Sequence, residues 1–188
     1  MFEEFVRGAV QADRYLTAEN VPYALNSNAR SIRDGRWKAD ATSDIDIVAI
    51  RPARSGARRV LAINCKGGRE ELNIERDLAR LDAANPHQTV AGGNVVTGFR
   101  ELTEPDWACA FRQRVHAVTG QTEFTHVLAV KRIVGDRTRW STHAPFLRLT
   151  PNLLLWDLQD LLEMANRPTA RVFGNSPTRH LVDLIAAA

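Results

Sequence analysis

Two apolar segments joined by a turn-forming stretch constrain the fold of this 188-residue chain more than any other feature. Residues 44–50 read Asp-Ile-Asp-Ile-Val-Ala-Ile, and residues 60–68 read Val-Leu-Ala-Ile-Asn-Cys-Lys-Gly-Gly. The connection, residues 51–59, contains a proline, a glycine and several arginines, a composition typical of a hairpin turn. We therefore expect two antiparallel neighbouring strands.

The polar residues of these segments are expected on one face, because side chains alternate between the faces of a strand. A hairpin symmetric about Ser55 sets Asp46 opposite Asn64. The same register sets Asp44 opposite Lys66. Two carboxylates, an amide and an ammonium group then gather at one end of an apolar sheet. Burying unpaired charges is costly, so these groups have to pair with each other, bind a metal or meet solvent.

The segments resemble the metal-binding core of the PD-(D/E)xK nucleases, and most closely the Mrr-like restriction endonucleases and the Holliday-junction resolvases. In that superfamily one strand carries an acidic metal ligand, and the next strand carries an acid, any residue and a lysine. The resemblance covers the first third to half of the chain. It implies that Asp46 is the first acid and Lys66 the lysine. Asn64 stands where the family has an acid, which is a departure from the pattern.

The resemblance implies hydrolysis of DNA phosphodiester bonds with Mg²⁺ or Mn²⁺ as the cofactor. The implied metal ligands are Asp46, the side-chain oxygen of Asn64 and the backbone carbonyl of Cys65. Lys66 would orient the attacking water or offset charge in the transition state. Asp44 would support the site by holding Lys66 or by binding the metal through water.

The first helix of the resembled family often supplies a further glutamate to the site. Glu3 matches that position best in sequence, and Asp13 is the alternative because it lies closer to the apolar face of the expected helix. An ordinary first-turn acid, favoured by the helix dipole, is the other interpretation of Glu3. Among the acids that follow Lys66, one of Glu70, Glu71 and Glu75 could instead approach the site.

The net charge of +3 and the pI of about 9.2 permit a nucleic-acid partner without requiring one. Two basic stretches adjoin the Asp46 segment in sequence and are predicted to contact phosphates. The predicted contact residues are Arg30, Arg33, Arg36, Lys38, Arg54, Arg58 and Arg59. DNA is the expected partner, and a homodimer or a partner protein could supply specificity.

No apolar run is long enough to span a bilayer, and the N-terminus lacks the pattern of a signal peptide. The two cysteines do not suggest a disulfide framework, so a cytoplasmic protein is expected. The five histidines have no paired metal-ligand spacing, and no P-loop or Gly-x-Ser-x-Gly motif is present.

The order of elements predicts an α/β fold: a restriction-endonuclease-like three-layer domain with a mixed central sheet flanked by helices. A single domain over residues 1–188 is expected, with a core motif region at about 1–100 and additional strands and helices at about 101–188. The expected helices are 2–18, 70–84, 103–119, 152–165 and 179–186, and the expected strands lie within 21–32, 124–134 and 139–142.

Two other functions stay open at this point. The chain could be a catalytically degenerate nuclease fold that binds nucleic acid or protein without cutting, an interpretation favoured by Asn64 because an amide brings no negative charge. It could also be a structural interaction domain in which Asp44 and Lys66 form an ion pair.

Overall fold

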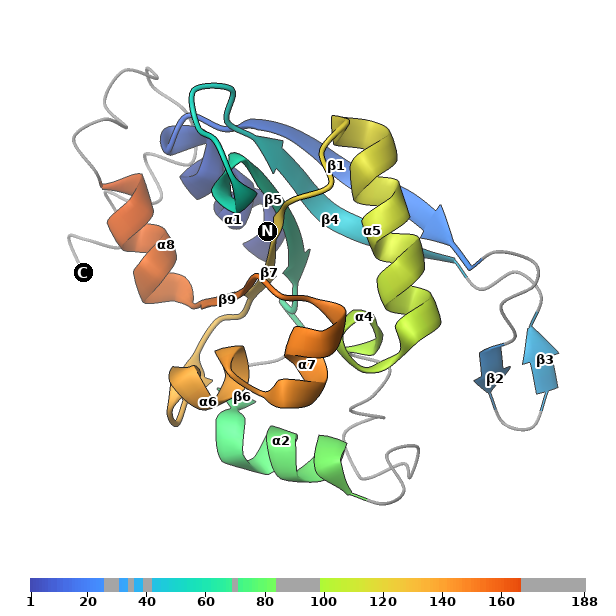
Figure 1. The fold of residues 1–188 in the computed structure, drawn as a ribbon. Helices are drawn as coiled ribbons and strands as arrows, with labels where there is room; N and C mark the ends of the chain where they lie inside the picture. The colour runs from blue at the N-terminus through green and yellow to red at the C-terminus, as the bar shows by residue number, and fades with distance from the viewer. Residues whose placement is uncertain (26–30, 34–35, 39–41, 69–70, 84–98, 167–188) are drawn as a thin grey trace.

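The computed structural model describes residues 1–25, 31–33, 36–38, 42–68, 71–83 and 99–166. The chain folds into an α/β domain with a central five-stranded mixed sheet between helices, as predicted (Figure 1). The strand order is β1-β4-β5-β7-β9. The strands are β1 (Leu16–Ala24), β4 (Thr42–Ile50), β5 (Val60–Cys65), β7 (Thr125–Ala129) and β9 (Leu153–Trp156).

The predicted hairpin forms the centre of this sheet. Strands β4 and β5 are antiparallel, and Ile50 lies opposite Val60, in the predicted register. A short 3-10 helix, η1 (Ala57–Arg59), lies within their connection. Strand β1 is antiparallel to β4, whereas β7 and β9 continue the sheet parallel to β5. The carboxyl ends of β5, β7 and β9 therefore meet at one edge of the sheet.

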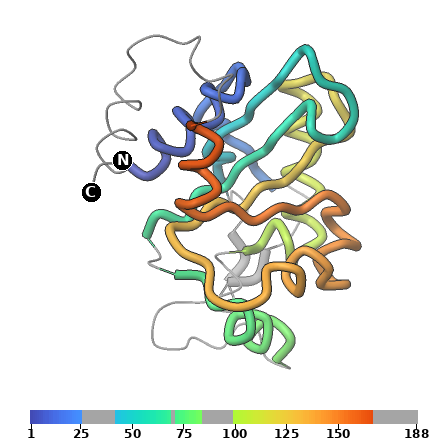
Figure 2. Tube along the Cα trace, turned by 90° about the vertical axis from the view of Figure 1, so that its left-hand side faces the viewer, coloured from blue at the N-terminus to red at the C-terminus, as the bar shows by residue number. Residues whose placement is uncertain are grey.

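Helices cover both faces of the sheet (Figure 2). On one face α1 (Phe2–Ala12) and α8 (Leu158–Ala165) pack together over β4, β5 and β7, with Val6 and Ile63 in the shared core. On the other face α5 (Pro105–Thr119) packs Trp107 and Phe111 against β1 and β4. The helix expected over 103–119 forms from Pro105 to Thr119, and Gly120 ends it in the left-handed region (φ 69°).

A third hydrophobic core lies among the helices and short strands in the lower part of the view in Figure 1. Trp140 and Phe146 are fully buried there against the later strands. The elements involved are α4 (Arg100–Thr103), α2 (Ile74–Asp82), α6 (Arg137–Ser141), α7 (Ala144–Leu149), and the short strands β6 (Leu72–Asn73) and β8 (Ile133–Val134). A separate two-stranded ribbon, β2 (Ser31–Arg33) and β3 (Arg36–Lys38), is inserted between β1 and β4.

The first predicted helix is too long. It ends at Ala12, because Arg14 adopts a positive φ of 66° and the chain then enters β1 at Leu16. Leu16 fits the helical spacing of the sequence but is 69% exposed. The helix expected from residue 70 begins at Ile74, where the Asn73 side chain accepts from the Arg76 N–H.

Two predictions in the second half of the chain are wrong. Residues 139–142 were expected as a strand, but they belong largely to α6, which Asp136 caps by accepting from the Thr138 N–H at 2.8 Å. The leucine-rich segment 152–165 divides into β9 and α8, because a capping box of Asp157 and Asp160 starts the helix only there. A short apolar run does not distinguish a buried strand from a helix.

Strands β7 and β9, from the second half of the chain, complete the same sheet as β4 and β5. The expected helix 179–186 lies outside the described residues. In the part of the chain that the structure describes, no helix has the length and apolar character needed to cross a bilayer.

Candidate active site at the ends of β4 and β5

The strict alternation expected along β4 breaks at Asp46. Ile45 packs in the α5-side core, whereas Ile47, two residues later, packs in the α1-side core. On β1 the residue that the register sets opposite Asp46 is Asn20, which adopts a positive φ of 49°. The sheet is therefore distorted locally at Asp46, and the prediction of one continuous polar face is wrong there.

Asp46 is half-buried, and its carboxylate turns toward the backbone of β5. The β4–β5 pairing ends at Ile47 and Ile63. Beyond this pair, Asp46 Oδ2 accepts a hydrogen bond from the Cys65 N–H at 2.5 Å. Burial raises the pKa of Asp46, while the Cys65 N–H and the charge of Lys66 lower it. Oδ2 thus holds the carboxylate in place, and Oδ1 has no hydrogen-bond partner among the described residues.

The β4–β5 register sets Asn64 opposite Asp46, but the Asn64 side chain is buried in the protein interior. It is 3% exposed, and its Oδ1 lies 2.8 Å from Nε2 of His126, which is 2% exposed. Burial lowers the pKa of His126 to about 4, so the ring is neutral at pH 7. Since the Asn64 oxygen accepts, Nε2 carries the proton. The Asn64 oxygen, which was expected to bind a metal, therefore accepts a buried hydrogen bond from His126 instead.

Lys66 follows directly after β5 and is half-buried. Its backbone N–H donates to the Ala129 carbonyl at 2.8 Å, which fixes the chain between β5 and β7. Its ammonium group forms no ion pair with Asp44 or with any other described residue, and Asp44 is exposed. The purely structural Asp44–Lys66 pair is thus absent from the described residues.

Helix α1 approaches the site at Gly67. A Cβ at Gly67 would lie 3.2 Å from Cβ of Phe2, so glycine permits this close approach. The neighbouring Glu3 is exposed, and its charge contributes to raising the pKa of both Asp46 and Cys65, after the burial that dominates each shift. Glu3 is therefore the α1 acid beside the site.

Asp13, the alternative to Glu3, lies at the other end of the sheet. It is 5% exposed and pairs with Arg51 at 3.2 Å and with Arg54 at 3.9 Å. Arg51 also lies over the Tyr15 ring, 5.8 Å from its centroid. Asp13 thus holds the β4–β5 turn onto the end of α1.

Sequence reasoning missed Glu101, a buried acid whose charge is among those that raise the pKa of Asp46. It is 4% exposed and comes from α4, on the α5 side of the sheet. Its Oε1 accepts from the Tyr23 hydroxyl at 2.5 Å. The charge of Glu101 contributes to the pKa values of Asp46 and His126, in each case after burial. No local pattern in the sequence points to this residue.

The predicted phosphate contacts divide between two places. Arg33, Arg36 and Lys38 belong to the β2–β3 ribbon, inserted where β1 ends and β4 begins, next to the Asp46 end of the sheet. Arg54, Arg58 and Arg59 lie in the β4–β5 turn, and Arg30 is outside the described residues. From Asp46 to Ile50 the strand advances about 13 Å, so the turn does not share the Asp46 end.

The remaining acids that sequence reasoning considered lie in other contacts. Glu71 pairs with Arg76 at 3.6 Å, and Glu75 with Arg139 at 3.6 Å, while Glu70 is outside the described residues.

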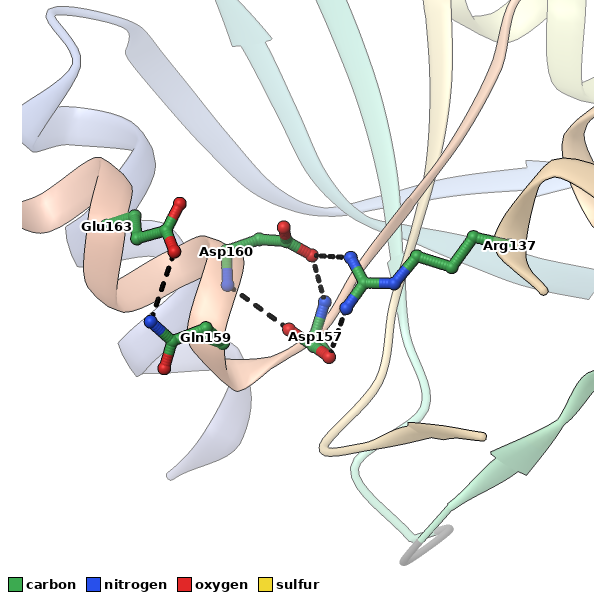
Figure 3. Close-up of polar contacts among 5 residues, drawn as sticks. All are labelled: Arg137, Asp157, Gln159, Asp160 and Glu163. Carbon is green, nitrogen blue, oxygen red and sulfur yellow. Dashed lines mark hydrogen bonds and ion pairs between the residues drawn. The ribbon is translucent and has the colours of Figure 1, made fainter. Parts of the chain in front are cut away.

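A paired ionic cluster occupies the end of β9. Arg137 bonds to Asp160 at 2.5 Å and also to Asp157, and the two acids cap α8 (Figure 3). Each of the three side chains has an ionic partner within the cluster, and the capping box explains where α8 begins.

A described pocket of about 460 Å³ lies at the opposite edge from Asp46. It is bordered by Ser55, Ala57, Arg58, Thr125, Ser141, Pro151, Asn152, Leu153 and Leu154. These residues belong to the β4–β5 turn and to the amino ends of β7 and β9. The pocket is therefore separate from the Asp46 end.

Within the described ranges, no group of three or more histidine, cysteine, aspartate or glutamate side chains is arranged to hold a metal ion. Mg²⁺ needs fewer protein ligands than that, because it keeps several waters and binds through one or two carboxylates plus substrate phosphate. Oδ1 of Asp46, which accepts no hydrogen bond from the described part of the chain, fits this mode of binding, whereas the Asn64 oxygen does not.

No protein-family model matches this chain, and no curated protein does. A solved structure described as a protein of unknown function, AF1548, resembles it with a TM-score of 0.38 and 12% sequence identity. That likeness covers 97% of this chain and 77% of the other. A likeness at this level says nothing about function.

Proposed function

We propose that this chain is a metal-dependent nuclease that hydrolyses DNA phosphodiester bonds, with a PD-(D/E)xK-like site at the ends of β4 and β5. The observation that carries the proposal is the half-buried Asp46, held through one oxygen by the Cys65 N–H, beside Lys66, which forms no ion pair within the described ranges. Charged groups left without an ionic partner at the carboxyl edge of a sheet are typical of a site that receives a charged ligand.

Each residue has a role that follows from its chemistry. Asp46 binds Mg²⁺ or Mn²⁺ through Oδ1, because hard carboxylate oxygens suit these ions. The bound ion supplies charge stabilisation at a phosphoryl oxygen. Lys66 orients the attacking water or donates to a phosphate oxygen as negative charge develops. The Cys65 N–H keeps the Asp46 carboxylate oriented, and a ligand role for the Cys65 carbonyl remains part of the proposal.

A supercoiled-plasmid nicking assay tests this function. With Mg²⁺ or Mn²⁺ the wild type is expected to nick, and chelation should stop it. Asp46→Asn and Lys66→Met should each lower the rate at least about 100-fold. Glu123→Gln is the matched control, since this exposed acid precedes β7 at the other end of the sheet. Nicking by Asp46→Asn at the wild-type rate would contradict the assignment.

A second candidate is a catalytically degenerate nuclease fold that binds nucleic acid or a partner protein. The buried Asn64–His126 hydrogen bond favours it, because the position of the usual second acid is used for packing. DNA binding that weakens with salt, in a protein that never nicks under any divalent cation, would support this candidate over the enzyme.

A further inference from the structure

The pocket of about 460 Å³ lies between the β4–β5 turn and the amino ends of β7 and β9, at the edge of the sheet opposite Asp46. Pockets that bind small molecules have volumes of roughly 300–1,000 Å³, and this one falls within that range. The proposed phosphodiester chemistry takes place at the other edge and makes no use of it. The pocket is therefore a candidate for a second ligand site.

Arg58 gives this pocket a positive charge. It is the one charged side chain among the described residues that line the pocket, and it forms no ion pair within the described ranges. By contrast, Arg51 and Arg54 of the same turn pair with Asp13. An arginine without an acidic partner, on a pocket with no acid in its described lining, favours an anionic ligand.

Three side chains of the lining have hydrogen-bond donors that no described residue accepts from: Ser55, Arg58 and Asn152. Two further hydroxyls of the lining are engaged, because Thr125 donates to a backbone carbonyl at 3.1 Å and Ser141 donates to another at 3.2 Å. Ser55 and Arg58 belong to the β4–β5 turn, whereas Asn152 comes directly before β9. The available donors therefore come from two separate segments that border the pocket.

Both of these segments are fixed through their backbones. The Arg58 carbonyl accepts from the Tyr15 hydroxyl at 2.9 Å. The Asn152 carbonyl accepts from the His126 N–H at 2.8 Å. Since these bonds use backbone oxygens, they leave the guanidinium and amide groups of the two side chains available to a ligand. A pocket whose backbone is fixed in this way loses less conformational entropy when a ligand binds.

We propose that this pocket binds a small organic molecule through a phosphate monoester group. Such a group presents three terminal oxygens, enough to accept from donors on both segments. The apolar residues of the lining suit the organic part of the ligand, since small-molecule sites combine an apolar lining with a few polar groups. They are Ala57, Pro151, Leu153 and Leu154. The site is independent of the proposed function, because neither Asp46 nor Lys66 is among the described residues that border it.

Backbone amide NMR of the full chain, titrated with phenyl phosphate in the presence of a chelator, tests this proposal. The signals of Ser55, Arg58 and Asn152 should shift, while those of Cys65 and Lys66 should not. The dissociation constant should lie below about 10 mM. Inorganic phosphate, which lacks an apolar part, and benzoate, which offers two oxygens, should both bind more weakly. Equal binding of either one, or shifts confined to Cys65 and Lys66, would overturn the proposal.

Arg58→Gln separates binding in the pocket from general attraction to a basic protein. The Arg58 side chain is exposed, so the variant is expected to keep the wild-type melting temperature. Its affinity for phenyl phosphate should fall at least about tenfold, because a charged donor is lost. Arg132→Gln is the matched control, since this exposed arginine follows β7 at the other edge of the sheet. It should bind within about twofold of the wild type, and equal affinity in Arg58→Gln would overturn the assignment.

A short DNA duplex distinguishes a small molecule from nucleic acid as the source of the phosphate group. The duplex should not displace phenyl phosphate from the wild type. Displacement together with shifts at Ser55 and Asn152 would mean that the pocket receives a nucleic-acid phosphate, and would overturn the assignment to a small molecule. Plasmid nicking by Arg58→Gln should equal that of the wild type, so the pocket and the proposed function can fail separately.

Discussion

Both ends of the β4–β5 hairpin carry acidic and basic side chains, but these side chains form ion pairs at one end only, within the described residues. At the turn end, buried Asp13 is paired with Arg51 and Arg54. At the strand end, the charge of Lys66 acts on Asp46, but neither residue forms an ion pair among the described residues. The charges at the turn are paired, whereas burial at the strand end raises the pKa of Asp46, so that its ionised form costs stability. A fold retains such a penalty most readily where the charges serve a ligand.

The end of β9 supports the same distinction. There Arg137 joins the two acids that cap α8, and all three charges are satisfied within the protein. Proximity of charges to the carboxyl edge of the sheet is therefore not enough to indicate a site. Asp46 differs because its carboxylate is half-buried, is oriented by one backbone N–H and has no further hydrogen-bond donor among the residues that the structure describes.

The largest expected effect concerns the strand end at low pH. Because the pKa of His126 is about 4 in the folded protein against 6.5 ordinarily, the unfolded state binds a proton first as the pH falls. This linkage removes about 3 kcal/mol of stability between pH 6.5 and pH 4. Urea unfolding at several pH values should show this loss in the wild type and a smaller one in His126→Gln, which still donates to Asn64. Equal pH dependence in both proteins would refute the assignment.

The next largest effect is expected from removing the acid that pairs with the arginines at the β4–β5 turn. Asp13→Ala leaves two partly buried arginines without their acid and should lower the free energy of unfolding by about 2 kcal/mol. The measurement is denaturant unfolding. Mn²⁺ affinity, corrected for the folded fraction, should be unchanged, and a loss of affinity would show that the two ends are not independent.

A substitution at the unpaired end should have the opposite sign. Burial raises the pKa of Asp46, so its ionised form reduces stability above that pKa, and the penalty disappears as the pH falls. Asp46→Asn should therefore melt at or above the wild-type temperature at pH 7 and lose this advantage at pH 3. The Asn oxygen can still accept from the Cys65 N–H. A clear drop in melting temperature at pH 7, as expected for Asp13→Asn, would show that Asp46 stabilises the fold.

The smallest effects concern phosphate contacts at the two ends. Replacing Arg33, Arg36 and Lys38 by alanine should lessen the salt dependence of DNA binding by about one unit of slope per lost contact. Arg58→Ala, in the β4–β5 turn, should change the slope less, because the turn lies at the end of the hairpin away from Asp46. The reverse order would place the DNA at the turn and its neighbouring pocket.

The hairpin and the α/β class could be predicted because they depend on local signals. Alternating apolar residues and turn chemistry specified both strands and their register. The same signals misled at Leu16, which extends a helical pattern but lies in a strand, and in residues 152–165, where a leucine-rich run contains β9 and then α8.

The inner arrangement of the site could not be read from the sequence. The Asn64–His126 bond joins residues 62 apart, and the Tyr23–Glu101 bond joins residues 78 apart. Neither leaves a periodic or spaced pattern, because the first depends on the parallel pairing of β5 with β7 and the second on the position of α4 beside β1. A histidine with no spacing partner and a glutamate in a short helix look ordinary until the fold brings the first to Asn64 and the second to Tyr23.

A crystal soaked in Mn²⁺ and measured for anomalous scattering tests the central claim most directly. The account predicts a peak beside Oδ1 of Asp46, within about 2.0–2.3 Å of a carboxylate oxygen, and no peak at Asp13. A peak at Asp13, or none at Asp46 at a Mn²⁺ concentration that saturates binding in solution, would contradict the assignment of the strand end as the metal site.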